Sequence, residues 1–278
     1  MAQHETQRVE VLCLDAIGTI FTFRRTREEL LAAILQARYG IIADPKFIAD
    51  ETTRLRRAIP RGNLDMDAYW EERINPRLFR RLGIRGSIKR KIRRVRRVLF
   101  STPEHFMVRK DMRQFIEHFG QRTDVQLAIA SNHDLPLLLD LLRHFDLDRH
   151  FAPPLIFTSQ QLGHSKPSRE YFECIRKACK LKHLEQIALI GNSLENDGFA
   201  WQHGMRVCVI DVSGSLMRLR ATIPSGITPA RMMRDVWPWV HGACGIEWRV
   251  GEPISDDGSD GHANEQIVTL ARAANGGK

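Results

Sequence analysis

The sequence lacks any apolar run that approaches the roughly 18 residues of a membrane-spanning helix. Cysteine is also scarce: the five thiols are odd in number, and no two of them form a CxxC pair. This pattern argues against a disulfide framework or a zinc site and favours reduced thiols. The first eight residues are polar and include an acid, so we expect no secretory signal. Together these absences predict a cytoplasmic protein that does not contact a membrane.

Acidic residues are sparse in one segment of the chain. Residues 24–110 hold 23 Lys and Arg against 10 Asp and Glu, although the whole chain carries a net charge of only +9. The stretch 77–97 contains eleven basic residues and no acid. Such a field favours a small anionic substrate. A nucleic acid or an acidic partner bound at 77–97 is an alternative that we favour less, because no interleaved aromatic platform accompanies the charge. A packed helix with a solvated basic face would also account for the excess of basic residues at 77–97.

A short apolar run opens the ordered part of the sequence. Residues 9–14 read Val-Glu-Val-Leu-Cys-Leu and predict a buried strand that delivers Asp15 at its carboxyl end. Gly18 allows a sharp turn after it, and the Thr19 hydroxyl can orient the carboxylate. Ligands bind at this edge of open α/β sheets, so Asp15 is a candidate nucleophile or cation ligand. An ordinary Asp-containing turn is the alternative from this segment alone.

Strand-like and helix-like stretches then alternate along the chain. We predict strands at 125–130, 155–158, 186–190 and 206–210, and helices at 135–142, 169–180, 195–203 and 229–237. Between residues 24 and 110 helical spacing takes over, with one helix ending at Gly40 and an apolar stripe at positions 84, 88, 92, 95 and 99. This alternation predicts an α/β fold with a parallel sheet and right-handed crossovers.

Four groups of polar residues follow the predicted strands in chain order: Asp15 with Thr19, Ser131 with Asn132, Lys166 before Pro167, and Gly191-Asn192-Ser193 with Asp197. In this order, with a helical insertion after the first, they resemble the haloacid dehalogenase (HAD) superfamily. Its opening motif Asp-x-Asp-Gly-Thr-Leu stands here as Asp15-Ala16-Ile17-Gly18-Thr19-Ile20. Its motif Gly-Asp-Ser-x-x-Asn-Asp stands at 191–197 as Gly-Asn-Ser-Leu-Glu-Asn-Asp.

The resemblance implies a Rossmann-like parallel sheet with an inserted α-helical cap domain. Residues 1–23 and 111–212 would form the core and residues 24–110 the basic cap. We further expect residues 213–250, which include Trp237, Trp239 and Trp248, to pack on the core as an extension. The polar stretch 251–278 is expected to be a mobile tail.

The resemblance also implies roles for individual residues. Asp15 would be the nucleophile, Ser131 would hydrogen-bond the transferred group, and Lys166 would neutralise charge. Thr19 completes the predicted catalytic set, and Gly18 and Asn132 would contact the substrate. Magnesium would be held by Asp15, the main-chain carbonyl of Ile17, Asn192 and Asp197.

Two motif positions depart from the family pattern. Ile17 replaces the second Asp, which acts as general acid and base in the phosphatases, and losing such a group typically costs about 10²- to 10⁴-fold in rate. Asn192 replaces a magnesium-binding Asp, so it keeps an oxygen ligand but loses a negative charge. We therefore expect a weakened Mg²⁺ site.

Three hypotheses follow from these departures. The first is a phosphate monoester hydrolase of attenuated activity, with His164 or Glu195 as the proton carrier. The second is a metal-independent 2-haloacid dehalogenase, in which Arg25, Arg27 or Arg38 holds the substrate carboxylate. The third is a non-catalytic protein that binds a partner through its basic cap. We expect the scattered histidines to be surface or capping residues: His105, His118, His133, His144 and His150.

Overall fold

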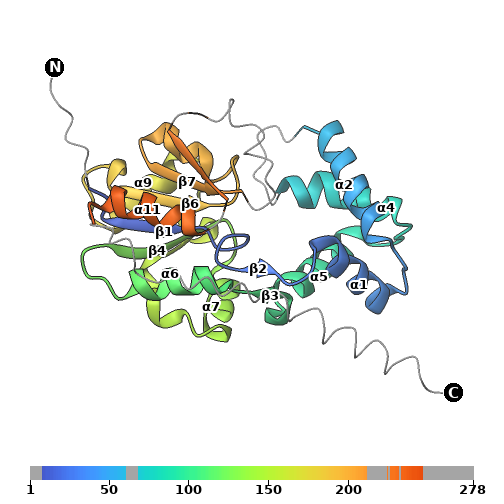
Figure 1. Ribbon diagram of the computed structural model, residues 1–278. Helices are drawn as coiled ribbons and strands as arrows, with labels where there is room; N and C mark the ends of the chain where they lie inside the picture. The colour runs from blue at the N-terminus through green and yellow to red at the C-terminus, as the bar shows by residue number, and fades with distance from the viewer. Residues whose placement is uncertain (1–7, 61–67, 212–223, 225, 232, 247–278) are drawn as a thin grey trace. The chain divides into compact units, whose positions relative to one another are not determined.

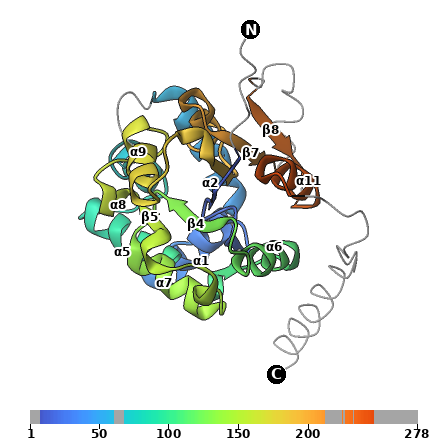
Figure 2. The same ribbon diagram turned by 90° about the vertical axis from the view of Figure 1, so that its left-hand side faces the viewer.

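The computed structural model describes residues 8–60, 68–211, 224, 226–231 and 233–246. The predicted mobile tail at 251–278, residue Trp248 and the whole segment 212–223 lie outside these residues. No helix in the described ranges is long and apolar enough to cross a bilayer. The structure is shown in two orientations in Figures 1 and 2.

A six-stranded parallel sheet forms the core and confirms the predicted α/β class. Its strands run in the order β5 (Ile156–Thr158), β4 (Gln126–Ser131), β1 (Val11–Leu14), β6 (Ile187–Gly191), β7 (Arg206–Ile210) and β8 (Ile227–Ala230). The chain builds outward from β1 first through β4 and then through β6. The carboxyl end of β1 therefore lies at a topological switch point, where open α/β sheets bind ligands.

Helices cover both faces of this sheet. In Figure 2, α6 (Lys110–Gly120) and α11 (Met233–Cys244) lie on one side, with α8 (Ser159–Leu162) and α9 (Arg169–Ala178) on the other. α7 (Leu135–His144) follows β4. Alternate residues of β1 serve the two faces: Val11 and Cys13 pack in a buried cluster with Tyr171 and Phe172 of α9. This packing fixes β1 and hence the position of Asp15.

The inserted helices lie in the chain between β2 (Thr22–Phe23) and β3 (Phe106–Met107), which pair as an antiparallel two-stranded ribbon. They are α1 (Arg27–Tyr39), α2 (Pro45–Ala58), the π-helical turn η1 (Tyr69–Ile74), α4 (Asn75–Arg81) and α5 (Ile88–Phe100). A capping box of Thr26 and Glu29 starts α1, and Gly40 ends it in the left-handed conformation as predicted. These helices share a buried cluster of their own. We refer to them as the cap helices.

Three predicted helices differ from the observed elements. Ile84 is buried like the apolar residues of α5 but lies before the start of that helix. The helix does not extend back to Ile84 because Gly83 and Gly86, on either side of it, both have positive φ. The stretch 195–203 becomes a turn around Asp197 followed by the short 3₁₀ helix η6 (Gly198–His203). Pro229 belongs to edge strand β8, where a missing N–H is tolerated, and α11 starts at residue 233.

Candidate active site

The loop after β1 is held by main-chain hydrogen bonds that fix the Asp15 side chain. The Asp15 N–H donates to the Ile190 carbonyl of β6 at 2.8 Å, and the Gly18 N–H donates to the Phe21 carbonyl at 2.7 Å. Gly18 has φ +98° and an added Cβ would lie 2.2 Å from the Asn192 amide nitrogen. Gly18 is thus needed both for the turn and for the approach of Asn192. Its predicted substrate contact remains a prediction.

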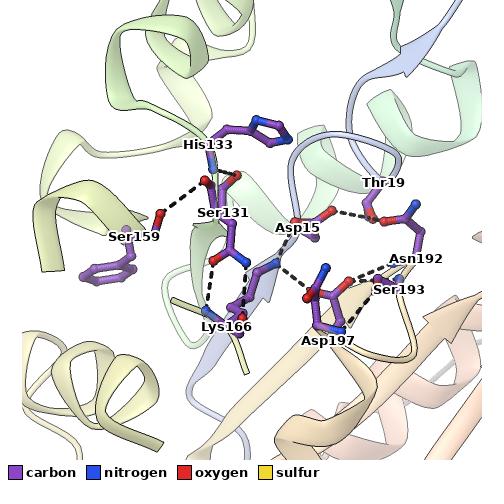
Figure 3. A network of polar contacts seen from close by, with 12 residues as sticks. Asp15, Thr19, Ser131, His133, Ser159, Lys166, Asn192, Ser193 and Asp197 are labelled. Atoms are coloured by element: carbon purple, nitrogen blue, oxygen red, sulfur yellow. Dashed lines mark hydrogen bonds and ion pairs between the residues drawn. The ribbon is translucent and has the colours of Figure 1, made fainter. Parts of the chain in front are cut away.

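Lys166 bridges two carboxylates from distant parts of the sequence (Figure 3). Its Nζ lies 2.6 Å from Oδ1 of Asp15 and 2.6 Å from Oδ1 of Asp197. All three side chains are buried, Asp15 being 8% exposed. Two carboxylates and one ammonium leave a net negative charge, so an anionic ligand at this place needs further positive charge.

Burial and ion pairing shift the pKa values of this group in opposite ways. Burial lowers the pKa of Lys166, but Asp15 and Asp197 outweigh it and hold that pKa above its ordinary value. Burial raises the pKa of Asp197, against the opposing effect of Lys166. Lys166 therefore stays a cation at neutral pH and acts as a charge partner rather than a proton carrier.

Asn132 positions Lys166 through the main chain. Its Oδ1 accepts from the Lys166 N–H at 2.9 Å, and its Nδ2 donates to the Lys166 carbonyl at 3.3 Å. The Ser159 hydroxyl in turn donates to the Asn132 carbonyl at 3.2 Å. We predicted Asn132 as a substrate contact; the structure shows that its amide group also fixes the backbone that carries the ammonium.

Of the two predicted hydroxyl groups, that of Thr19 contacts the Asp15 carboxylate. Thr19 Oγ1 donates to Asp15 Oδ2 at 3.4 Å, and Ser131 Oγ at the end of β4 accepts from the His133 N–H at 3.1 Å. Behind Ser131, the Tyr171 hydroxyl donates to the Phe157 carbonyl at 2.9 Å. Burial raises the pKa of the Cys13 thiol well above its ordinary value, which makes this neighbour of Asp15 a poor second nucleophile.

The residues predicted to hold magnesium offer oxygen donors that face one another. Asp197 Oδ2 accepts from the N–H groups of Asn192 at 3.2 Å and Ser193 at 3.0 Å, which fixes that carboxylate. Thr19 Oγ1 lies within 3.5 Å of both Asp15 Oδ2 and Asn192 Oδ1, so one hydroxyl contacts both of these oxygens. Carboxylate and amide oxygens suit a hard cation. The set fits Mg²⁺, with less negative charge than a site of carboxylates alone.

A cavity of about 280 Å³ opens above these residues. Its floor includes Asp15, Asn132, Lys166, Asn192 and Asp197, and its walls come from β2 and the cap helices. The side chain of Ile17 lines it and carries no transferable proton. Of the nine site residues predicted from the family motifs, Gly18, Thr19 and Ser131 are absent from its lining.

Neither predicted proton carrier reaches this cavity. His164 is exposed, and Glu195 lines a separate depression beside α2. His133, which we expected to be a surface or capping residue, instead lines the cavity with its ring 5.2 Å from that of Phe100. Of the three arginines predicted as candidates for holding a substrate carboxylate, Arg27 lines the cavity, and Arg25 and Arg38 do not.

The residues on the cap side of the site were not predicted from the sequence. Trp70, Phe79 and Phe100 line the cavity, and Arg96 joins them from the inward side of α5. Helical spacing signals only that such residues are buried in the cap helices, and gives no sign that they also face Asp15. The one available signal for His133 was its place directly after Ser131-Asn132 at a strand end.

Solved structures with the same fold are numerous. A HAD hydrolase from Bacillus subtilis, solved with bound magnesium, superposes with a TM-score of 0.68 at 20% identity, covering 84% of this chain and 99% of that one. A HAD family hydrolase from Deinococcus radiodurans with bound phosphate and sodium gives 0.60 at 13% identity, with 86% and 97% covered. An L-2-haloacid dehalogenase from Xanthobacter autotrophicus gives 0.59 at 14% identity, with 84% and 99% covered. At these identities the similarity shows the fold alone.

Sequence comparison gives more direct evidence of the family to which the chain belongs. Comparison with curated protein sequences gives no match. The family model described as haloacid dehalogenase-like hydrolase matches residues 9–200, a range that holds Asp15, Ser131, Lys166 and Asp197. With the parallel sheet and the Asp15–Lys166–Asp197 cluster in place, this match shows that the chain belongs to the haloacid dehalogenase-like hydrolase family.

Proposed function

We propose that this protein hydrolyses small phosphate monoesters through attack by Asp15. The observation that carries the proposal is the ion pair of Asp15 with Lys166 at the floor of the cavity. A carboxylate repels a phosphate, and an adjacent fixed cation removes much of that repulsion. The cap arginines Arg27 and Arg96 line the same cavity and add positive charge for an anionic ligand.

Each residue then has a defined task. Asp15 attacks phosphorus and forms an acyl phosphate while the ester oxygen departs. Lys166 offsets the charge of both nucleophile and substrate, and its backbone is held for this by Asn132. The Ser131 hydroxyl accepts the His133 N–H. Its predicted hydrogen bond to a phosphoryl oxygen stays a prediction, because Ser131 is buried and does not line the cavity. Water then cleaves the acyl phosphate and restores Asp15.

Magnesium would be held by Asp15, Asn192, Asp197 and the main-chain carbonyl of Ile17. When bound, it would supply positive charge to the transferring phosphoryl group. Thr19, which contacts both Asp15 and Asn192, orients two of these ligands. Because Asn192 carries no charge, we expect that a high magnesium concentration is needed for half-maximal activity.

The test is a panel of phosphate monoesters assayed with and without magnesium, with Asp15→Asn as the matched blank. The proposal expects magnesium-dependent release of phosphate by the wild type, and a loss of at least about 10³-fold in the variant. Equal rates for the two proteins on every substrate would overturn it.

One observation favours dehalogenation of 2-haloacids as a second candidate function. Ile17 lines the cavity where a proton carrier would be needed for an alcohol leaving group, whereas a halide leaves without one. The same panel therefore includes 2-haloacids. Magnesium-independent halide release abolished by Asp15→Asn would replace the phosphatase proposal with dehalogenation. Absence of both activities would leave the third hypothesis, a binding protein.

A further inference from the structure

The cap side of the cavity is apolar, although the cap surface is strongly basic. Seven apolar side chains from β2, α1, α4 and α5 line it: Phe23, Leu31, Phe79, Ile92, Val95, Leu99 and Phe100. Asn75 of α4 adds one side-chain amide. Trp70 from η1 adds an indole. Most of the basic side chains of α5 point to solvent, and its buried positions are Ile92, Val95 and Leu99. The outer surface of the cap is therefore basic, whereas the part of the cap that lines the cavity is mostly apolar.

The two arginines of the lining already have partners within the cap. The Arg27 guanidinium lies 4.4 Å from the centre of the Trp70 ring, and Arg96 donates to Glu71 at 2.7 Å. Stacking on indole covers one face of the Arg27 guanidinium. Both arginines are thus engaged within the cap.

Building on the phosphatase proposal, we infer that the substrate is a phosphate monoester whose alcohol part is an apolar body of about one or two rings. The phosphate would lie at the polar floor beside Lys166, and the body would fill the apolar side of a cavity of about 280 Å³. Most hydroxyl groups on that body would face the apolar side chains and lose water without gaining partners, because Asn75 supplies a single amide among them, so sugar phosphates would bind poorly.

The matched test compares cyclohexylmethyl phosphate with glucose 6-phosphate, two primary esters on six-membered rings that differ mainly in hydroxyl groups. Dissociation constants are measured by calorimetry on Asp15→Asn, so that binding is read without catalysis. We expect the apolar ester to bind at least about ten-fold more tightly. Equal affinity, or tighter binding of the sugar ester, would overturn the inference even if the wild type proves to be a phosphatase.

A variant pair on α5 checks the location. Val95→Asn places an amide in the cavity wall and is expected to weaken cyclohexylmethyl phosphate binding by about ten-fold or more, whereas Val98→Asn, outside the lining, should leave it unchanged. Thermal unfolding of both variants identifies any loss of folding. Equal affinities in two folded variants would contradict the placement. Tight binding by Asp15→Asn without wild-type turnover would refute the proposed function and leave this specificity intact.

A different observation, the set of ionisable groups in the cavity, carries a second inference. Within the lining these groups are Asp15, Asp197, Lys166, His133 and the two arginines. Asp15 is the nucleophile, Asp197 is fixed by two N–H groups and Lys166, and Lys166 is held between carboxylates. Arginine does not release its proton at physiological pH. The imidazole of His133 remains, a side chain that can both donate and accept a proton.

His133 is also placed between the floor and the cap side. Its N–H binds Ser131 Oγ at 3.1 Å, and its ring lies against Phe100 of α5. Figure 3 shows the imidazole directed away from the Ser131 hydroxyl that its main chain contacts. A leaving group that passes from the phosphate at the floor toward the apolar wall would pass this ring.

We infer that His133 is the proton donor that compensates for Ile17. As Asp15 bonds to phosphorus, the electrons of the ester bond move to the departing oxygen, which takes the imidazolium proton and leaves as the alcohol. The neutral imidazole then accepts a proton from the water that attacks the acyl phosphate, releasing phosphate and restoring Asp15 and the imidazolium.

The test varies the leaving group, because a nitrophenolate leaves without a proton and an alkoxide does not. His133→Gln is expected to lower kcat/KM about 10²- to 10⁴-fold for benzyl phosphate and by less than about ten-fold for nitrophenyl phosphate. His164→Gln, at the exposed candidate, should change neither. Added imidazole should restore part of the benzyl phosphate activity in His133→Gly. Equal losses on both esters, or a selective loss in His164→Gln, would overturn this inference while leaving Asp15 as nucleophile.

Discussion

At the scale of single residues, Lys166 sets the charge balance of the site. In the wild type its stabilising contribution is complete at neutral pH and is lost only as alkaline pH passes through its raised pKa. Lys166→Met would leave Asp15 and Asp197 as adjacent buried carboxylates, and we expect a cost of about 3–5 kcal/mol in unfolding free energy near neutral pH. Because burial already raises the pKa of Asp197, the deficit should shrink as pH falls and that carboxyl takes up a proton.

Chemical denaturation at about pH 8 and about pH 5 measures that difference. Lys177→Met, on the exposed side of α9, serves as the control and should cost little at either pH. A deficit in Lys166→Met that does not change between the two conditions would contradict the account of the ion-pair cluster.

Ile17 is the residue whose replacement should increase activity. Ile17→Asp returns a proton carrier to the cavity lining, and turnover of alkyl phosphates should rise by about ten-fold or more. Steady-state rates are compared with those of Ile17→Asn, which has nearly the same shape as Asp and transfers no proton. Similar rates in the two variants would show that acid–base chemistry does not limit turnover.

Asn192 is the residue of the predicted metal site whose replacement should strengthen magnesium binding. Asn192→Asp adds a negative charge where an amide oxygen now contacts the same Thr19 hydroxyl as Asp15, so the magnesium concentration for half-maximal activity should fall by about ten-fold. Asn75→Asp adds the same charge on the cap side of the cavity and is the control. An unchanged magnesium requirement in Asn192→Asp would argue against a site at this residue.

At the scale of elements, α11 and α6 pack together over one face of the sheet. Trp237 of α11 is 9% exposed and lies against Phe115 at 5.3 Å and Phe119 at 5.7 Å between ring centres. Trp237→Ala should cost about 3–5 kcal/mol in unfolding free energy, measured by denaturant titration. The half-buried Trp239 offers the comparison, and a loss in Trp239→Ala as large as that in Trp237→Ala would contradict the packing described.

The elements were predictable where local pattern and final burial agree. Strands β1, β4, β6 and β7 are short apolar runs because both faces of a parallel sheet are covered. Pro229 misled the prediction because proline can start a helix or occupy an edge strand, and only its pairing beside Val209 decides between them. Ile84 matched the period of α5, but the glycines on either side of residue 84 broke the helix.

At the scale of the whole molecule, the polar floor of the site was predictable and its opposite wall was not. Asp15, Ser131, Lys166 and Asp197 stand at or after the ends of neighbouring strands, which the topology of a parallel sheet brings to one edge. The apolar wall draws on β2 and four cap elements, and side chains such as Val95 and Leu99 belong to both the cap cluster and the cavity. Periodicity reports their burial without reporting what they face.

Attack by Asp15 requires that this residue becomes covalently modified during turnover. Its most direct test is acid quenching of wild-type protein during reaction with a phosphate monoester and magnesium, followed by mass spectrometry of the peptide that contains residue 15. The account predicts a phosphorylated Asp15 that is absent in Asp15→Asn and decays as free phosphate appears. Phosphate release by the wild type with no modification of Asp15 at any quench time would contradict it.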